Sequence, residues 1–125
     1  MNKFPKPNPT YDLEERTMVF SENIIGLSKC IERNISMNPL VDQLIRSATS
    51  IGANYTEANG ASSRKDFTNK ISICKKEAKE TLYWLRLIGK STVHPTIKDK
   101  CREIWIEAHE LVLIFASISA KLRIK

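Results

Sequence analysis

Apolar side chains recur at helical spacing in four consecutive stretches of the chain, which cover about residues 13–36, 39–58, 64–89 and 97–122. The first stretch ends with Ile35. In the last stretch, the apolar positions from Ile97 to Leu122 are alternately four and three residues apart, which is the spacing of helices packed side by side. Short connections separate the stretches. The pattern therefore predicts an all-α protein: an antiparallel, up-down-up-down four-helix bundle with short loops.

Polar and helix-breaking residues mark the predicted helix ends. Capping-box spacing, in which a side chain accepts from the amide three residues later, occurs at Asp12–Glu15 and at Ser63–Asp66. The pair Asn38-Pro39 predicts the start of the second helix, and Asn59-Gly60 predicts its end. Residues 1–10 contain alternate prolines, which favour an extended arm. The sequence therefore predicts a proline-rich arm over residues 1–10 and one bundle domain over residues 11–125.

Composition narrows the class of protein. The longest wholly apolar run, from Leu111 to Ala116, has six residues, far fewer than the roughly 20 that cross a bilayer. The N-terminus has no apolar segment typical of a secretion signal, so we expect a cytoplasmic protein without a membrane partner. The three cysteines form no metal-binding or redox pair pattern, and we expect no cofactor and no metal.

Positive charge is concentrated in the third stretch. The chain carries a net charge of +6, and residues 62–94 contribute +5 of it, from eight basic and three acidic residues. Such a surface attracts phosphates without reading sequence, although most lysine-rich helix faces are simply solvated. Candidate nucleic-acid-binding residues are Arg64, Lys65, Lys75, Lys76, Lys79, Lys121 and Arg123.

Polar residues also follow one side of the second and third predicted helices, next to the apolar seam. They are Arg46, Ser50, Asn54, Glu57, Glu77 and Glu80. We interpret them as an interhelical polar network, in which Arg46 meets a glutamate and Asn54 bonds across the seam. The alternative is a carboxylate cluster for metal binding or acid-base catalysis. No histidine, nucleophile or glycine-rich phosphate loop accompanies the glutamates, so we do not expect an enzyme.

The last two predicted helices have more apolar surface than one core requires. The candidates for an oligomer interface are Tyr83, Trp84, Leu87 and Trp105. Large aromatic side chains dominate the energy of many interfaces, which favours self-association. The alternative is a wide core with single apolar residues at the surface.

Three segments carry a family resemblance. They are Gln43-x-x-Arg46-Ser47-Ala48-x-Ser50-Ile51-x-Ala53-Asn54-x-x-Glu57, Ser63-Arg64-Lys65-Asp66-Phe67, and Lys76-Glu77-Ala78-x-Glu80-Thr81-x-Tyr83-Trp84-Leu85. The sequence resembles the four-helix bundle proteins known as 23S rRNA intervening sequence proteins, or the S23 ribosomal protein family. Where the family pattern has glycine after Asn-x-x-Glu, this chain has Ala58.

The resemblance implies a cytoplasmic bundle of bacterial type that assembles as a ring-shaped homopentamer and has no known enzymatic activity. A related branch is similar to an accessory protein of diversity-generating retroelements, a basic pentamer that binds nucleic acid and a reverse transcriptase. The resemblance assigns no catalytic role to the six residues of the polar network or to Trp84.

Together, charge and resemblance predict a non-enzymatic homo-oligomer that binds RNA or DNA non-specifically through a basic surface. The alternative is a protein-protein scaffold or adaptor, such as an accessory protein of a retroelement reverse transcriptase.

Overall fold

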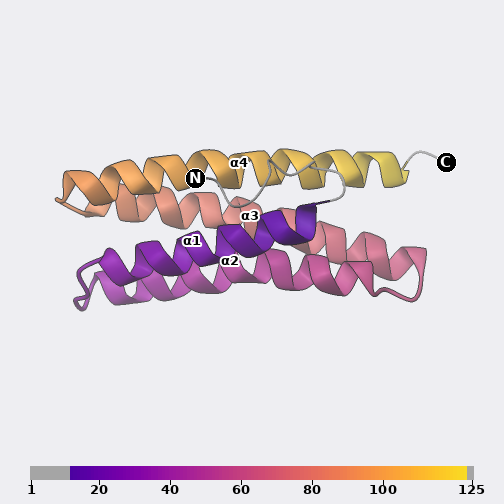
Figure 1. Cartoon of the computed structure of the whole chain (residues 1–125), viewed down its shortest axis with the longest axis horizontal. Helices are drawn as coiled ribbons and strands as arrows, with labels where there is room; N and C mark the ends of the chain where they lie inside the picture. The colour runs from indigo at the N-terminus through magenta and orange to yellow at the C-terminus, as the bar shows by residue number, and fades with distance from the viewer. Residues whose placement is uncertain (1–11, 124–125) are drawn as a thin grey trace.

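A computed structural model of the protein describes residues 12–123, so the predicted arm at residues 1–10 lies outside the described residues. The described chain forms four helices and no strand: α1 (Leu13–Cys30), α2 (Met37–Asn59), α3 (Arg64–Ser91) and α4 (Pro95–Arg123). Consecutive helices run in opposite directions and are joined by short turns (Figure 1). The predicted four-helix bundle is therefore confirmed.

The start of α3 follows the sequence prediction, and the start of α1 does so only in part. Ser63 is the residue before α3, and its hydroxyl accepts a hydrogen bond of 3.0 Å from the amide of Asp66. Asp12 is in the same position before α1, but its side chain accepts no such bond. Its backbone carbonyl accepts from the amide of Arg16 instead, at 2.9 Å. The prediction of a side-chain cap at Asp12 is wrong.

The connection between α1 and α2 also corrects the sequence prediction. α1 ends at Cys30 rather than near residue 36, because Ile31 takes an extended conformation, and Ile35 is 91% exposed. The side-chain oxygen of Asn34 accepts hydrogen bonds from the backbone amides of Ser36, at 3.0 Å, and Met37, at 2.8 Å. These bonds give the backbone a partner outside a helix, so α1 stops early and α2 begins at Met37 instead of after Asn38.

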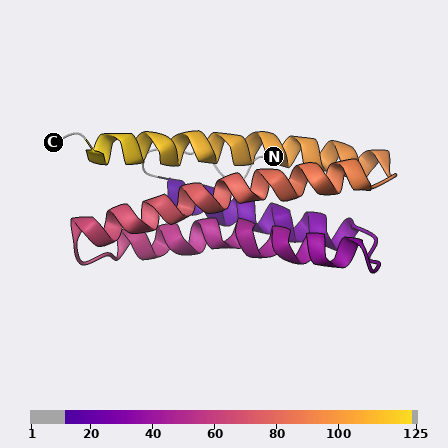
Figure 2. The same cartoon turned by 180° about the vertical axis from the view of Figure 1, so that it is seen from behind.

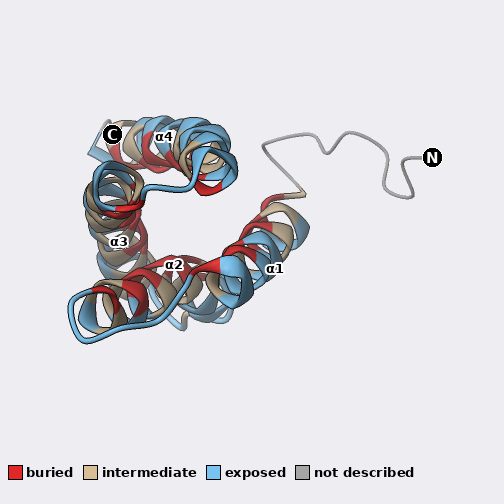
Figure 3. Cartoon of the chain, turned by 90° about the vertical axis from the view of Figure 1, so that its left-hand side faces the viewer, coloured by how far each residue is buried: buried red, intermediate tan, exposed pale blue. Residues whose placement is uncertain are grey.

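α3 is the central helix of the bundle. Seen from behind, it lies between α2 and α4 (Figure 2), and it packs extensively against both. The end-on view shows the buried residues on the inward sides of the helices (Figure 3). The largest fully buried side chains include Phe20 of α1, Leu44 of α2, Leu85 of α3 and Phe115 of α4. A buried hydrogen bond of 3.0 Å from Thr81 to Ser47 joins α3 to α2 within this core.

Of the helix pairs in contact, α1 and α4 pack against each other least, and an ion cluster joins them. The Nε atom of Arg16 lies 2.7 Å from Glu107, and its Nη2 atom lies 2.9 Å from both Glu107 and Glu110. Only 14% of the Arg16 side chain is exposed. The hydrogen bonds to Glu107 raise the pKa of Arg16 above its ordinary value, so the guanidinium is charged near pH 7.

A glycine sets the distance between α1 and α2. A Cβ atom on Gly52 would lie 3.2 Å from both Cβ and Oγ1 of Thr17, closer than ordinary side-chain contacts. Gly52 therefore lets the two helices approach each other at this level. None of the helices between residues 12 and 123 combines the length and apolar character needed to cross a membrane.

Candidate nucleic-acid interface

The basic residues of α3 are mostly free of intramolecular partners. All eight basic residues between positions 62 and 94 fall within Arg64–Ser91. Lys70 is paired, with its Nζ atom 2.6 Å from Glu57 of α2, and this hydrogen bond raises the pKa of Lys70. Within residues 12–123, none of the other seven has an acidic oxygen within 4.0 Å. The positive charge of α3 is therefore available to an external anion.

These free cations lie on two sides of α3. At about 100° per residue, Lys75, Lys79, Arg86 and Lys90 fall within roughly 60° of arc, on the side next to α4. Lys65 and Lys76 lie opposite the core and are exposed. Lys79 is also exposed, and Lys75 is half-buried. The cations thus extend from the outer face of α3 to its border with α4.

A second group of cations gathers where α3 begins and α4 ends, which is one end of the bundle (Figure 1). Arg64 is exposed and donates a hydrogen bond of 2.8 Å to the carbonyl of Leu122. Lys121 and Arg123 are exposed in the last turn of α4. Cations are favoured at a helix C-terminus, so these residues also stabilise α4.

The predicted polar network forms only in part. Arg46 contacts Glu80 at 2.8 Å, which confirms the expected pair between α2 and α3. Asn54 instead bonds Ser50 of its own helix, at 2.9 Å to the carbonyl and 2.8 Å to the hydroxyl, so the bond expected across the seam is absent. Glu57 pairs with Lys70, and one buried oxygen of Glu77 has no hydrogen-bond partner within residues 12–123.

The three glutamates of this network therefore do not share one site. In the described part of the chain, no group of three or more histidine, cysteine, aspartate or glutamate residues is placed to hold a metal ion. Two of the three carboxylates are instead neutralised by a basic side chain, Glu57 by Lys70 and Glu80 by Arg46. The arrangement favours the interpretation as contacts between helices.

The four apolar interface candidates lie on two different sides of α3. Tyr83 is 60% exposed, and its ring meets that of Trp84 edge-on with centroids 4.9 Å apart. Trp84 is partly buried, and its indole nitrogen donates a hydrogen bond of 3.0 Å to Glu80 on the side that faces α2. Leu87 is half-buried. Trp105 stacks on His109 of α4, with centroids 5.2 Å apart, and borders α3 on its other side, so it does not extend the surface around Tyr83.

The cysteine thiols are not poised for chemistry in the core. Burial raises the pKa of Cys74 to about 12 and that of Cys101 to about 11, so both are neutral thiols near pH 7. Cys30 is exposed at the end of α1. The thiols of Cys74 and Cys101 therefore serve as small apolar groups.

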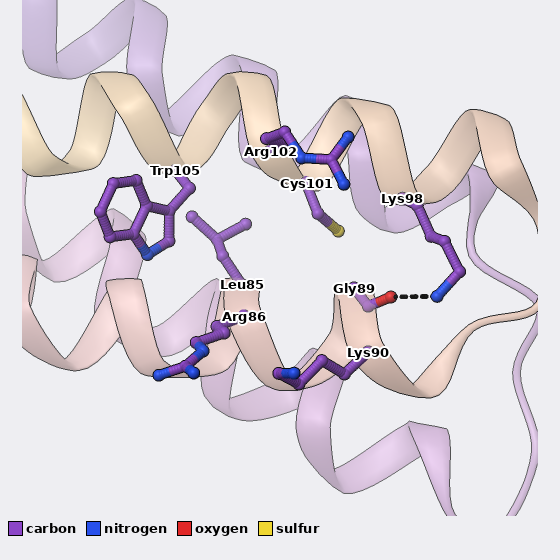
Figure 4. Close-up of a pocket in the computed structure, with 8 residues that line it drawn as sticks. All are labelled: Leu85, Arg86, Gly89, Lys90, Lys98, Cys101, Arg102 and Trp105. Carbon is purple, nitrogen blue, oxygen red and sulfur yellow. Dashed lines mark hydrogen bonds between the residues drawn. The ribbon is translucent and has the colours of Figure 1, made fainter.

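Sequence reasoning missed one group of basic residues. Arg86 and Lys90 of α3 and Lys98 and Arg102 of α4 line a pocket between the two helices, which Trp105 closes at one end (Figure 4). The sequence contains the signal, since these residues flank the apolar seam on both helices. Their convergence, however, depends on how α3 and α4 are aligned, which the sequence pattern alone does not fix.

Comparison with known proteins agrees with the fold. A family model described as 23S rRNA-intervening sequence protein matches residues 10–112. A solved structure of a protein of unknown function from the S23 ribosomal protein family, from Bacteroides thetaiotaomicron VPI-5482, is 32% identical with a TM-score of 0.75. The match covers 86% of this chain and 97% of that one. None of the curated proteins matches the sequence.

Proposed function

Since the chain belongs to the 23S rRNA-intervening sequence protein family, we propose that it is a non-enzymatic, homo-oligomeric bundle that binds RNA or DNA through phosphates. The observation that supports this proposal is the set of seven basic residues on α3 without an acidic partner in the described chain. Unpaired cations on a regular helix contact a phosphate backbone without reading bases, so binding is not sequence-specific.

Self-association strengthens this surface. Tyr83 is 60% exposed in the second half of α3, where it adjoins Trp84 and offers a large aromatic anchor for a second copy, whereas Lys65 and Lys76 lie in the first half of the helix. The family resemblance favours a pentamer. Each added copy contributes its own net charge of +6, so an oligomer presents a stronger positive field than a single chain. Sedimentation velocity tests this step: we expect the oligomer to dissociate in Tyr83→Ser, and a monomeric wild type would refute self-association.

The test of nucleic-acid binding compares two variants of equal charge. Lys76→Glu/Lys79→Glu reverses two exposed cations of α3, and Lys29→Glu/Lys100→Glu reverses two exposed cations of α1 and α4. Both variants lose the same net charge, so long-range attraction falls equally. We expect only the α3 variant to lose most of its affinity for a labelled RNA near 50 mM salt, with a slope of log affinity against log salt about 2 units shallower.

Three results would count against the proposal. No binding by the wild type near 50 mM salt removes nucleic acid as a ligand. Equal losses in the two variants show that net charge acts without a defined α3 surface. A strong preference among unrelated sequences indicates base readout, which phosphate contacts do not provide.

A second candidate function is a protein-protein scaffold or adaptor, such as an accessory protein of a reverse transcriptase. Two apolar side chains of α4 favour it, because Ile106 and Leu113 are 56% and 55% exposed and lie seven residues apart on one face. A partner that co-purifies after nuclease treatment supports this function. Loss of the partner on nuclease treatment supports nucleic-acid binding instead.

A further inference from the structure

The pocket between α3 and α4 is lined mainly by basic and apolar residues. It has a volume of about 420 Å³ and lies at the end of the bundle near the connection between the two helices. Buried Leu85 and Cys101 form its floor together with Gly89, which adds no side chain. Trp105 stands at one end and Lys98 at the other, with basic side chains along both helices (Figure 4). A pocket of this size holds one small ligand rather than a stretch of polymer.

The side chains around this pocket are mainly hydrogen-bond donors. Arg86 and Lys90 are exposed and have no acidic partner within residues 12–123. Lys98 donates a hydrogen bond of 2.9 Å to the carbonyl of Gly89, and this bond holds the lysine ammonium at one end of the pocket. Arg102 pairs with Asp99 at 3.1 Å, but both side chains are about 70% exposed, and such pairs are weak. A ligand rich in acceptor oxygens therefore finds four cations and no lining carboxylate.

The remaining lining residues neither neutralise the positive charge nor offer an acceptor that would occupy the cations. Burial raises the pKa of the Cys101 thiol to about 11, so it adds no negative charge near pH 7. The indole nitrogen of Trp105 faces α3 in Figure 4 and is a donor without acceptor capacity. The indole also provides a flat, apolar surface beside the cations. Such a surface suits a planar heterocycle that is attached to an anion.

We propose that this pocket binds a nucleoside phosphate, with its phosphate oxygens on Arg86, Lys90 and Arg102 and its base against Trp105. The ligand is a free nucleotide or the phosphorylated end of a strand, which share this chemistry. The site shares Arg86 and Lys90 with the seven cations of α3, but it also requires α4, and its ligand goes beyond the function proposed above. Binding here requires a compact anion joined to a base, whereas the outer face requires only a phosphate backbone.

Tryptophan fluorescence provides a direct test. The chain has two tryptophans, so Trp84→Phe leaves Trp105 as the only one. Titration of this variant with AMP is expected to change the fluorescence of Trp105 until it saturates. Inorganic phosphate is expected to bind at least about tenfold more weakly, and adenosine without phosphate more weakly still, because each lacks one set of contacts. Adenosine or phosphate that binds as tightly as AMP overturns the proposal, and so does a wholly unchanged signal.

Matched variants locate the site. In the Trp84→Phe background, Arg86→Ala/Lys90→Ala removes two lining cations, and Lys65→Ala/Lys76→Ala removes two cations from the outer side of the same helix. We expect the pocket variant to bind AMP at least about tenfold more weakly and the outer variant to stay within about twofold. All four residues are exposed, so both variants should melt like their parent. Equal effects of the two variants overturn the proposal.

Oligonucleotides distinguish the two sources of the ligand. If the pocket takes strand ends, a short oligonucleotide with a 5′-phosphate binds more tightly than AMP and more tightly than its 5′-hydroxyl form. If it takes free nucleotides, AMP binds at least as tightly as the phosphorylated oligonucleotide. The AMP titration and the RNA titration of Lys76→Glu/Lys79→Glu use different residues, so the pocket and the outer face can each fail alone.

Discussion

Two helical glycines provide a matched test of how closely α1 and α2 are packed. Gly26 of α1 is exposed, and a Cβ atom built on it meets nothing within 4 Å. A Cβ atom on Gly52 of α2 lies 3.2 Å from the Cβ and Oγ1 atoms of buried Thr17. The substitution Gly→Ala therefore makes the same chemical change in open space at one site and in a packed interface at the other.

The expected stabilities follow from two opposing effects. Alanine has a higher helix propensity than glycine, which stabilises either helix by about 1 kcal/mol. Only Gly52→Ala adds overpacking, which costs about 1–3 kcal/mol. Thr17 cannot move aside easily, because its hydroxyl is bonded to the carbonyls of Leu13 and Glu14 at 2.9 and 3.0 Å and the contact involves its Cβ atom. Gly26→Ala is therefore expected to stabilise the protein, and Gly52→Ala to be neutral or to destabilise it by up to about 2 kcal/mol.

Thermal unfolding followed by far-UV circular dichroism measures both effects. A change of 1 kcal/mol corresponds to about 4 °C in a domain of this size, so Gly26→Ala should melt about 4 °C higher than the wild type. Gly52→Ala should melt about 4–12 °C lower than Gly26→Ala. Thr17→Ala in the Gly52→Ala background should recover part of the loss, because it removes the Oγ1 contact. An equal rise in the two single variants would refute the claim that Gly52 sets the helix spacing.

Two further predictions concern the ion cluster and a buried thiol. Arg16→Met should lower the free energy of unfolding by about 2 kcal/mol, between the values typical of exposed and buried pairs, while Arg102→Met should cost about 0.5 kcal/mol or less. Urea denaturation checks this difference, and equal costs would show that the Arg16 cluster does not hold α1 to α4. The pKa of Cys74 is raised from 9.0 to about 12 by burial, so its contribution to stability is complete below pH 9 and is lost as the pH rises toward 12. Cys74→Ala should therefore lose about 1 kcal/mol less stability than the wild type between pH 8 and pH 10, and parallel losses in urea titrations would contradict this origin.

The spacing of apolar residues was sufficient to predict the four helices, but it placed the end of α1 too late. Ile35 continues the apolar spacing of α1, so the pattern extends that helix to about residue 36. In the structure the chain leaves the helix at Ile31, and Asn34 bonds the first amides of α2. A local side-chain bond thus outweighs one further apolar residue. The spacing of apolar residues does not reveal this competition between a side-chain hydrogen bond and the helix, because the outcome depends on backbone geometry.

Some contacts between helices could be predicted from the sequence, and others could not. The pair Arg46–Glu80 was predictable, because both residues flank the seam between neighbouring antiparallel helices and carry opposite charge. The hydrogen bond of Asn54 within α2 was not predictable, since a side-chain amide finds acceptors on its own helix as readily as on the neighbouring helix. The pocket between α3 and α4 depends on how the two helices are aligned, so counting charges along α3 included Arg86 and Lys90 without showing that they line a pocket with Lys98 and Arg102 of α4.

The order in which the helices pack also has a consequence for the speed of folding. Packing is most extensive between helices that follow each other in the chain, and the sparse contact of α1 with α4 is the one helix pairing in residues 12–123 that joins distant segments. Because local contacts form with little loss of loop entropy, the hairpins α2–α3 and α3–α4 can form before the ends of the chain meet. The seam closed by Arg16 is then completed after the rate-limiting step. Loosening it should shorten the lifetime of the native state and leave the folding rate nearly unchanged.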